Sequence, residues 1–198
     1  MPYVLCANLG FEVSGLCASE FIHWPLRHIS TLRAFQMKLC PNTNQPEQDI
    51  VYTPSYAAKR IFKHFAPTGT MIEPCRGECA FYNEMPENSA WCEIQEAKDF
   101  LVHNGSYDWL ITNPPWSKIR EFLAHAISLR IKNIVFLINI NALTTKSRLN
   151  LIYQNNYHIA EFFCLPTPKE FPQTGFQLAA VHIKQGNNAN TQFTVGAY

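Results

Sequence analysis

The chain has 198 residues, of which 47% are hydrophobic and only 16% are charged, so it is long and apolar enough for one globular domain and is not a charge-rich disordered chain. Its formal net charge of +1 excludes a global basic field of the kind that attracts nucleic acid, although a local groove can still be basic. No stretch approaches the roughly 18 uncharged apolar residues that a membrane-spanning helix needs.

Seven cysteines are spread along the chain, an odd number that does not fit a secreted disulfide framework. The first residues carry no cationic leader, and Glu12 and Glu20 interrupt the apolar run before it could act as a secretion signal. We therefore expect a cytoplasmic protein whose free thiols fill small spaces in the core.

Residues 1–49 form an N-terminal segment whose role the sequence does not define. Apolar residues at helical spacing indicate a helix within residues 19–39, although Pro25 interrupts it. Residues 40–49 are polar and contain two prolines, which is typical of a linker. We place a domain boundary there.

From residue 50 onward the pattern of apolar residues becomes regular. Thr53, Pro54 and Ser55 are expected to open a helix over residues 56–65, because proline is favoured in the first turn. Strands are predicted at residues 70–73, 91–94, 108–112, 133–140, 158–165 and 177–184, and helices at residues 81–85, 117–129 and 144–153.

This alternation predicts an α/β fold with a mostly parallel sheet over residues 50–185, followed by a polar tail at residues 186–198 that we expect to be loosely held. In open α/β sheets, ligands bind beyond the carboxyl ends of the strands. Three of the predicted strand ends carry unusual polar chemistry, at residues 73–82, 93–100 and 113–116. We expect these segments to line one crevice.

The most specific of the three segments is Asn113-Pro114-Pro115-Trp116. Two consecutive prolines make a rigid strand exit that can hold the Asn113 side chain and the Pro114 carbonyl as fixed acceptors. Two acceptors aimed at one point would orient the hydrogens of an exocyclic or amide NH2 and free its lone pair for attack on an electrophile. Trp116 offers a flat face on which a planar base could stack. The alternative is a plain turn, because Asn-Pro commonly opens one.

The order of these motifs resembles that of the class I S-adenosylmethionine-dependent methyltransferases. It runs from the Thr-Pro-Ser helix start through EPCRGECAFY and an acidic strand end to DWLITNPPW. Within that family the chain is most similar to the amino-methyltransferases that act on adenine N6, in particular the small phage and bacterial DNA-adenine-methylase-like proteins. The resemblance covers residues 50–184 and implies a Rossmann-like, seven-stranded, mostly parallel sheet with an antiparallel last strand. It also implies S-adenosyl-L-methionine as cofactor, nucleic acid, in particular DNA, as partner, and the cytoplasm of a bacterial or phage-infected cell.

The resemblance further implies roles for the residues that match the family's motifs. The tetrapeptide from Asn113 through Pro114 and Pro115 to Trp116 matches the catalytic motif. The implied cofactor-binding set is Thr53 and Pro54 at the methionine end, Glu73, Pro74, Cys75 and Gly77 in the loop after the first strand, Glu93 at the ribose hydroxyls, and Asp99 and Phe100 at the adenine ring.

One position departs from the family's pattern. The loop after the first strand usually has a second glycine two residues after the first, and Cys79 stands there. Its side chain could crowd the cofactor or tilt the start of the following helix. The first two strands are also close together, which leaves room for only a short helix.

Several other readings of these residues stay open. The cysteines at positions 75, 79 and 92 could suggest zinc, but no local histidine completes a ligand set, so we predict no metal. The loop at residues 166–175, with Lys169 and Phe171, is either a substrate-contacting loop or a long hairpin connection. Four cations could touch phosphate or could simply lie on a solvated helix face: Lys118, Arg120, Arg130 and Lys132.

Two alternative functions also stay open. The same tetrapeptide could present an RNA base or a protein glutamine amide, since both offer a planar NH2. The chain could instead be a non-catalytic nucleic-acid-binding module whose cofactor site has decayed. Because a chain of this size leaves little room for a separate recognition domain, target specificity would come from short loops, the N-terminal segment or a partner protein.

Overall fold

The computed structural model describes residues 50–173, 175–188 and 190–196. The helix predicted within residues 19–39 and the linker predicted at residues 40–49 lie outside the described residues.

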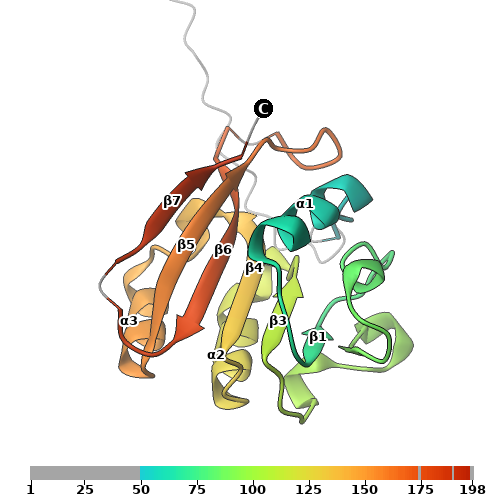
Figure 1. Cartoon of the computed structure of the whole chain (residues 1–198), viewed down its shortest axis with the longest axis horizontal. Coiled ribbons are helices and arrows are strands. Elements are labelled where there is room, and N and C mark those ends of the chain that lie inside the picture. The colour runs from blue at the N-terminus through green and yellow to red at the C-terminus, as the bar shows by residue number, and fades with distance from the viewer. Residues whose placement is uncertain (1–49, 174, 189, 197–198) are drawn as a thin grey trace, which may run out of the picture. The chain divides into compact units, whose positions relative to one another are not determined.

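A seven-stranded mixed sheet forms the centre of the described fold, with the strand order β2-β1-β3-β4-β6-β5-β7 (Figure 1). Strand β6 runs antiparallel to both of its neighbours, β4 and β5, and the other neighbouring strands are parallel. The strands are β1 (Met71–Glu73), β2 (Ala90–Trp91), β3 (Trp109–Thr112), β4 (Asn133–Asn139), β5 (Tyr157–Leu165), β6 (Leu178–Gln185) and β7 (Gln192–Val195). The predicted seven-stranded, mostly parallel α/β fold is confirmed.

Helices cover both faces of this sheet. In Figure 1, α1 (Ser55–Phe65) lies in front of the sheet, while α2 (Ile119–Ser128) and α3 (Lys146–Gln154) lie behind it. Side chains alternate along β4 between these two layers, since Val135 packs in the core cluster of α1 and Ile134 packs in that of α2. The five central residues of β4 are buried, as its continuous apolar run predicts for a central strand.

Helix α1 begins where the sequence predicts, because Pro54 provides both a suitable φ and a free carbonyl. Its φ is −64°, and its carbonyl accepts the backbone N–H groups of Ala57 at 2.9 Å and Ala58 at 3.2 Å. The helix ends at Ala66, which has a left-handed conformation and donates its N–H to Phe62.

The predicted second strand, residues 91–94, is wrong in its extent. Strand β2 ends at Trp91, and the chain turns into a short 3-10 helix at Ile94–Glu96. The Glu93 carboxylate accepts the N–H of Gln95, which caps that turn and ends the strand. Ile94 is consequently exposed instead of buried in the sheet.

The prediction of a loosely held tail at residues 186–198 is also wrong in part, because β7 lies within it. β7 pairs in parallel with β5 at the edge of the sheet. The Phe193 ring stacks on Phe162 with a centroid distance of 4.7 Å, and the Thr194 hydroxyl donates to the Glu161 carboxylate. These contacts with β5 are distant in the sequence, so the polar composition of the tail does not reveal them.

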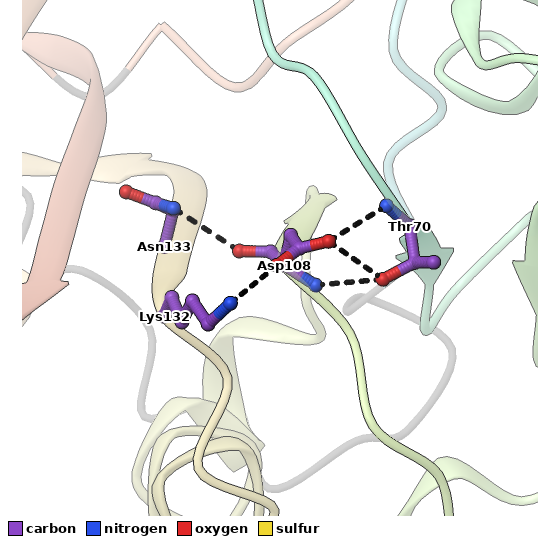
Figure 2. Close-up of polar contacts among 4 residues, drawn as sticks. All are labelled: Thr70, Asp108, Lys132 and Asn133. Atoms are coloured by element: carbon purple, nitrogen blue, oxygen red, sulfur yellow. Dashed lines mark hydrogen bonds and ion pairs between the residues drawn. The ribbon is translucent and has the colours of Figure 1, made fainter.

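The amino ends of β1, β3 and β4 are tied together by Asp108, as Figure 2 shows. Its carboxylate accepts both the backbone N–H and the hydroxyl of Thr70 at 3.0 Å, and the Lys132 ammonium at 2.8 Å. Its backbone carbonyl accepts two N–H groups of Asn133. The hydrogen bonds that the carboxylate accepts from Lys132, and then from the N–H and hydroxyl of Thr70, lower the pKa of Asp108 to about 2. Lys132 is therefore engaged at the amino edge, away from the carboxyl edge where ligands bind in such sheets.

Candidate active site

The loops that follow β1 and β2 meet at the carboxyl edge of the sheet. The two strands are paired in parallel, with Glu73 beside Trp91. The backbone N–H of Gly77 donates to the Glu93 carboxylate at 2.8 Å, and the N–H of Arg76 donates to the Cys92 carbonyl at 3.0 Å. The predicted juxtaposition of these two strand ends is therefore present.

The segment before α1 joins the same site. The Asn113 side chain, just after β3, donates from Nδ2 to the Val51 carbonyl at 2.8 Å. The neighbouring Tyr52 ring lies over Gly77, since a Cβ at Gly77 would stand only 3.2 Å from that ring. Sequence reasoning missed both contacts, because a backbone carbonyl such as that of Val51 leaves no signal in the sequence.

The amide of Asn113 is held in one orientation. Because Nδ2 is bound to the Val51 carbonyl, the Oδ1 atom is left as the acceptor, and the indole N–H of Trp116 donates to it at 3.3 Å. An amide oxygen has two lone pairs, so a second donor can still bind there. This arrangement provides the fixed acceptor that a planar NH2 group would need.

Trp116 contacts the loop between β5 and β6. The Trp116 and Phe171 rings are 6.5 Å apart and tilted by 48°, and Phe171 is buried. This loop is folded on itself, since the Gln173 side chain donates to the carbonyls of Pro168 and Phe171 at 2.8 Å. The loop thus reaches the tetrapeptide, as expected of a substrate-contacting segment, whereas its contact with a substrate stays a prediction.

The backbone of the loop after β1 explains why glycine is favoured in it. Gly77 has a φ of +48° and Cys79 a φ of +66°, both in the left-handed region. Glycine adopts this conformation freely, whereas an L-residue pays about 1–2 kcal/mol. Cys79 therefore stands at a position whose conformation favours the glycine that the family's pattern has there.

Glu73, at the end of β1, is a buried acid below this loop. Only 1% of it is exposed, and its Oε2 has no hydrogen-bond partner within the described residues. Burial raises the pKa of Glu73 to about 9, although the backbone N–H of Tyr82 and the charge of Arg76 oppose the shift. Glu73 is therefore protonated at neutral pH, and its orphaned oxygen is a polar atom that a bound cofactor could satisfy.

Pro74 and Cys75 continue the buried strand end. Pro74 is buried and Cys75 is half-buried. Burial, together with the nearby Glu93 carboxylate, raises the pKa of the Cys75 thiol, which disfavours a nucleophilic or metal-binding thiolate. In the part of the chain that the structure describes, no group of three or more His, Cys, Asp or Glu residues is placed to hold a metal ion.

Glu93 stands at the mouth of the site, where its carboxylate accepts the N–H groups of Gly77 and Gln95. Next to it, the Trp91 ring carries two cations, with the Arg76 guanidinium carbon 3.6 Å and the Lys98 ammonium 3.2 Å from its centroid. Sequence reasoning missed this cluster, because Arg76 is brought to Trp91 by the pairing of β1 with β2, and Lys98 by the bridge between Glu93 and Lys98.

Asp99 and Phe100 are placed differently from each other. Asp99 lines an open groove of about 510 Å³ along β2, and one of its oxygens accepts the N–H of Leu101 at 2.9 Å. Phe100 is 1% exposed and packs against the Phe122 and His125 rings. The expected stacking of Phe100 on a cofactor is therefore not available in this structure, because the ring lies in the core.

Thr53 and Pro54 complete the predicted set. Both are half-buried between Tyr52, which covers Gly77, and the start of α1. The structure therefore brings the segment before α1, the loops after β1 and β2 and the tetrapeptide into one site, and separates only the Phe100 ring from it.

Comparison with known proteins agrees with this architecture. No family model and no curated protein matches the chain. Among solved structures, it is similar to magnesium protoporphyrin IX methyltransferase from Synechocystis PCC 6803 with bound S-adenosylmethionine, at 10% identity and a TM-score of 0.50, over 66% of this chain and 79% of that one.

Two further structures are similar at the same level. A Pyrococcus horikoshii protein assigned as an RNA methyltransferase has 13% identity and a TM-score of 0.51, over 75% of this chain and 91% of that one. The M protein of the type I restriction enzyme EcoKI has 13% identity and a TM-score of 0.50, over 70% of this chain but only 44% of that one. The chain thus has the Rossmann-like class I methyltransferase fold. Within the described residues, no helix is long and apolar enough to cross a membrane.

Proposed function

We propose that this chain transfers a methyl group from S-adenosyl-L-methionine to the exocyclic amino group of adenine, at N6, in DNA. The observation that carries the proposal is the anchored amide of Asn113, whose Nδ2 is bound to the Val51 carbonyl so that Oδ1 is presented as an acceptor. The class I methyltransferase fold supports the proposal, because this acceptor lies at the carboxyl edge of such a sheet.

In the proposed reaction, the target base leaves the stack and lies against Trp116. Its amino group donates one hydrogen to Asn113 Oδ1 and the other to the Pro114 carbonyl, which draws the nitrogen lone pair out of conjugation with the ring. When bound, the cofactor supplies a methyl group made electrophilic by a sulfonium sulfur. Held by these two acceptors, the amino nitrogen would present its lone pair to that methyl group, and its surplus proton would pass to water.

The residues around the site fit this cofactor. Any side chain at position 77 would crowd the Tyr52 ring, so glycine keeps the loop beside this ring narrow. The buried Oε2 of Glu73 has no hydrogen-bond partner in the described part of the chain, so it is free to bind a polar group of the cofactor. We assign Glu93 to the ribose hydroxyls and Asp99 to the adenine amino group. The methionine end would lie by Thr53, Pro54 and the loop that contains Glu73, Pro74, Cys75 and Gly77.

Methyl transfer from labelled cofactor to DNA tests this proposal. Asn113→Ala is expected to lower the rate about 10²-fold or more, as removal of one preorganised polar group does in other active sites. Asn150→Ala, an exposed amide on α3, is the matched control and should leave the rate unchanged. A rate for Asn113→Ala equal to that of the wild type would contradict the mechanism.

The strained conformation of Cys79 favours one other candidate, a non-catalytic module with a decayed cofactor site. Calorimetry with S-adenosylhomocysteine separates the two candidates, since the proposed enzyme binds it and the decayed module does not. Transfer to RNA or to a glutamine amide would keep the class of reaction and change only the substrate.

A further inference from the structure

Helix α1 presents a cationic stripe, which we define as Tyr56, Lys59, Arg60 and Lys63. These positions are three and four residues apart, so their side chains form one row along the helix. Lys59 and Lys63 are exposed, and the sequence of α1, SYAAKRIFKHF, contains no acidic residue. The stripe is therefore a local positive surface on a chain whose net charge is only +1.

A small cavity lies beside the cationic stripe, and its lining includes residues of α1 and of the loop that joins β5 to β6. Its volume is about 240 Å³. Its apolar lining includes Leu137, Leu165 and Leu178, and the cationic residues Arg60 and Lys169 also line it. An apolar cavity below the size of a drug-binding pocket, with cations around it, suits one flat ring attached to an anionic group.

Two contacts connect the elements around the cavity to the proposed active site. Val51, just before α1, accepts the Asn113 side chain, so the start of α1 lies against the tetrapeptide. On the other side, Phe171 from the β5–β6 loop lies beside Trp116, and its N–H donates to the carbonyl of the cavity-lining Pro168 at 3.0 Å. A strand that places its target base on Trp116 would therefore continue across this surface.

The charges around the cavity favour a polyanion. Within residues 50–173, none of Lys59, Lys63 and Lys169 forms an ion pair with an acid. The nearest acid in the loop, Glu170, accepts a hydrogen bond from the Tyr56 hydroxyl at 3.4 Å. Lysines without an acidic partner can bind phosphodiester groups, which supply the sequence-independent part of the affinity for nucleic acid.

We infer that the cationic stripe, together with Lys169, binds the phosphodiester backbone of the substrate nucleic acid, and that the cavity receives a base next to the target. This inference rests on the proposed function, because it names how the same site would hold its substrate. It places substrate recognition on α1 and the β5–β6 loop.

The salt dependence of oligonucleotide binding tests the cationic part of this surface. The triple variant Lys59→Gln/Lys63→Gln/Lys169→Gln should bind short single-stranded DNA and RNA roughly tenfold more weakly, and the slope of log K against log salt should fall by about 2, since each phosphate contact contributes about 0.7–0.9. The control Arg130→Gln/Lys184→Gln removes two exposed cations near the amino edge of the sheet and should keep the wild-type slope. A triple variant with the wild-type slope overturns the inference.

The cavity is tested with abasic oligonucleotides of the same length. They should keep the salt slope but bind more weakly than the intact strands, and equal binding would contradict the assignment of the cavity. Failure of this inference can be distinguished from failure of the proposed function. A wild type that methylates DNA while the triple variant binds normally refutes only this surface, whereas stripe-dependent binding without methyl transfer refutes only the reaction.

Discussion

Glu73 illustrates how one buried residue controls the pH dependence of stability. Its pKa rises from an ordinary 4.5 to about 9 in the folded protein because of burial. Between these values the folded state keeps a proton that the unfolded state releases, so stability falls as the pH rises through this range, by at most about 1.4 kcal/mol per pH unit.

Replacing Glu73 with Gln should remove this dependence, because the amide keeps the shape of the side chain but does not ionise. The free energy of unfolding, measured with urea across this pH range, should fall more steeply with rising pH for the wild type than for Glu73→Gln. Glu87→Gln, in the exposed part of the following loop, provides the control and should parallel the wild type. Parallel curves for Glu73→Gln and the wild type would show that Glu73 is ionised when folded.

The strain at Cys79 gives a second prediction at the level of single residues. Because its φ is +66°, Cys79→Gly should relieve about 1–2 kcal/mol of strain and lose about 0.5–1 kcal/mol to the greater freedom of the unfolded chain. We expect a net gain of up to about 1.5 kcal/mol in the free energy of unfolding. Cys79→Ala keeps the Cβ and should show no such gain; a similar gain in both variants would locate the effect in the thiol instead.

The sequence identified several residues of the candidate site, but it did not identify the atoms that those residues contact. Rigid prolines and a strand end identified Asn113 as a fixed acceptor, because that information is local. The partner that fixes it, the Val51 carbonyl, is a backbone atom 62 residues away and has no sequence signature. The sequence also did not show that the Phe100 ring lies in the core, because an aromatic ring after a strand can pack there as readily as onto a ligand.

Among the elements, the amino ends of three strands depend on Asp108. Its folded pKa of about 2, below the ordinary 3.8, means that it contributes stability above pH 3.8 that is lost as the pH falls toward 2. Asp108→Asn should therefore lower the thermal midpoint at neutral pH and flatten the loss of stability in that acid range, both followed by circular dichroism. Glu121→Gln, on the exposed side of α2, should change neither, and an unchanged midpoint for Asp108→Asn would show that the contacts in Figure 2 are dispensable.

The elements that the sequence predicted best are those determined by local patterns. The proline-led start of α1 and the apolar run of β4 both appear within a residue of their predicted bounds. β2 and β7 are short strands at the two edges of the sheet, and their extent depends on contacts with β1 and β5. Such pairing is non-local, so a window of the sequence around either strand cannot reveal it.

At the scale of the whole molecule, near-neutral charge conceals an uneven distribution. The composition predicted no basic field, yet Arg60 of α1 and Lys169 of the β5–β6 loop line one cavity, and Lys59 and Lys63 are exposed on the same helix. Similarity to solved structures establishes the fold, while our proposal of a nucleic-acid substrate instead of a small molecule rests on this local surface. Raised ionic strength should therefore slow methyl transfer to an oligonucleotide more than it weakens the binding of S-adenosylhomocysteine, as kinetics and calorimetry at matched salt concentrations would show.

The central claim is tested most directly by identifying the methylated product. The purified full chain would be incubated with labelled S-adenosylmethionine and unmethylated DNA, and the DNA digested to nucleosides for mass spectrometry. We predict label in N6-methyladenine with the wild type and about a hundredfold less with Asn113→Ala. Label in a base methylated on ring carbon, or equal N6-methyladenine from both proteins, would contradict the account.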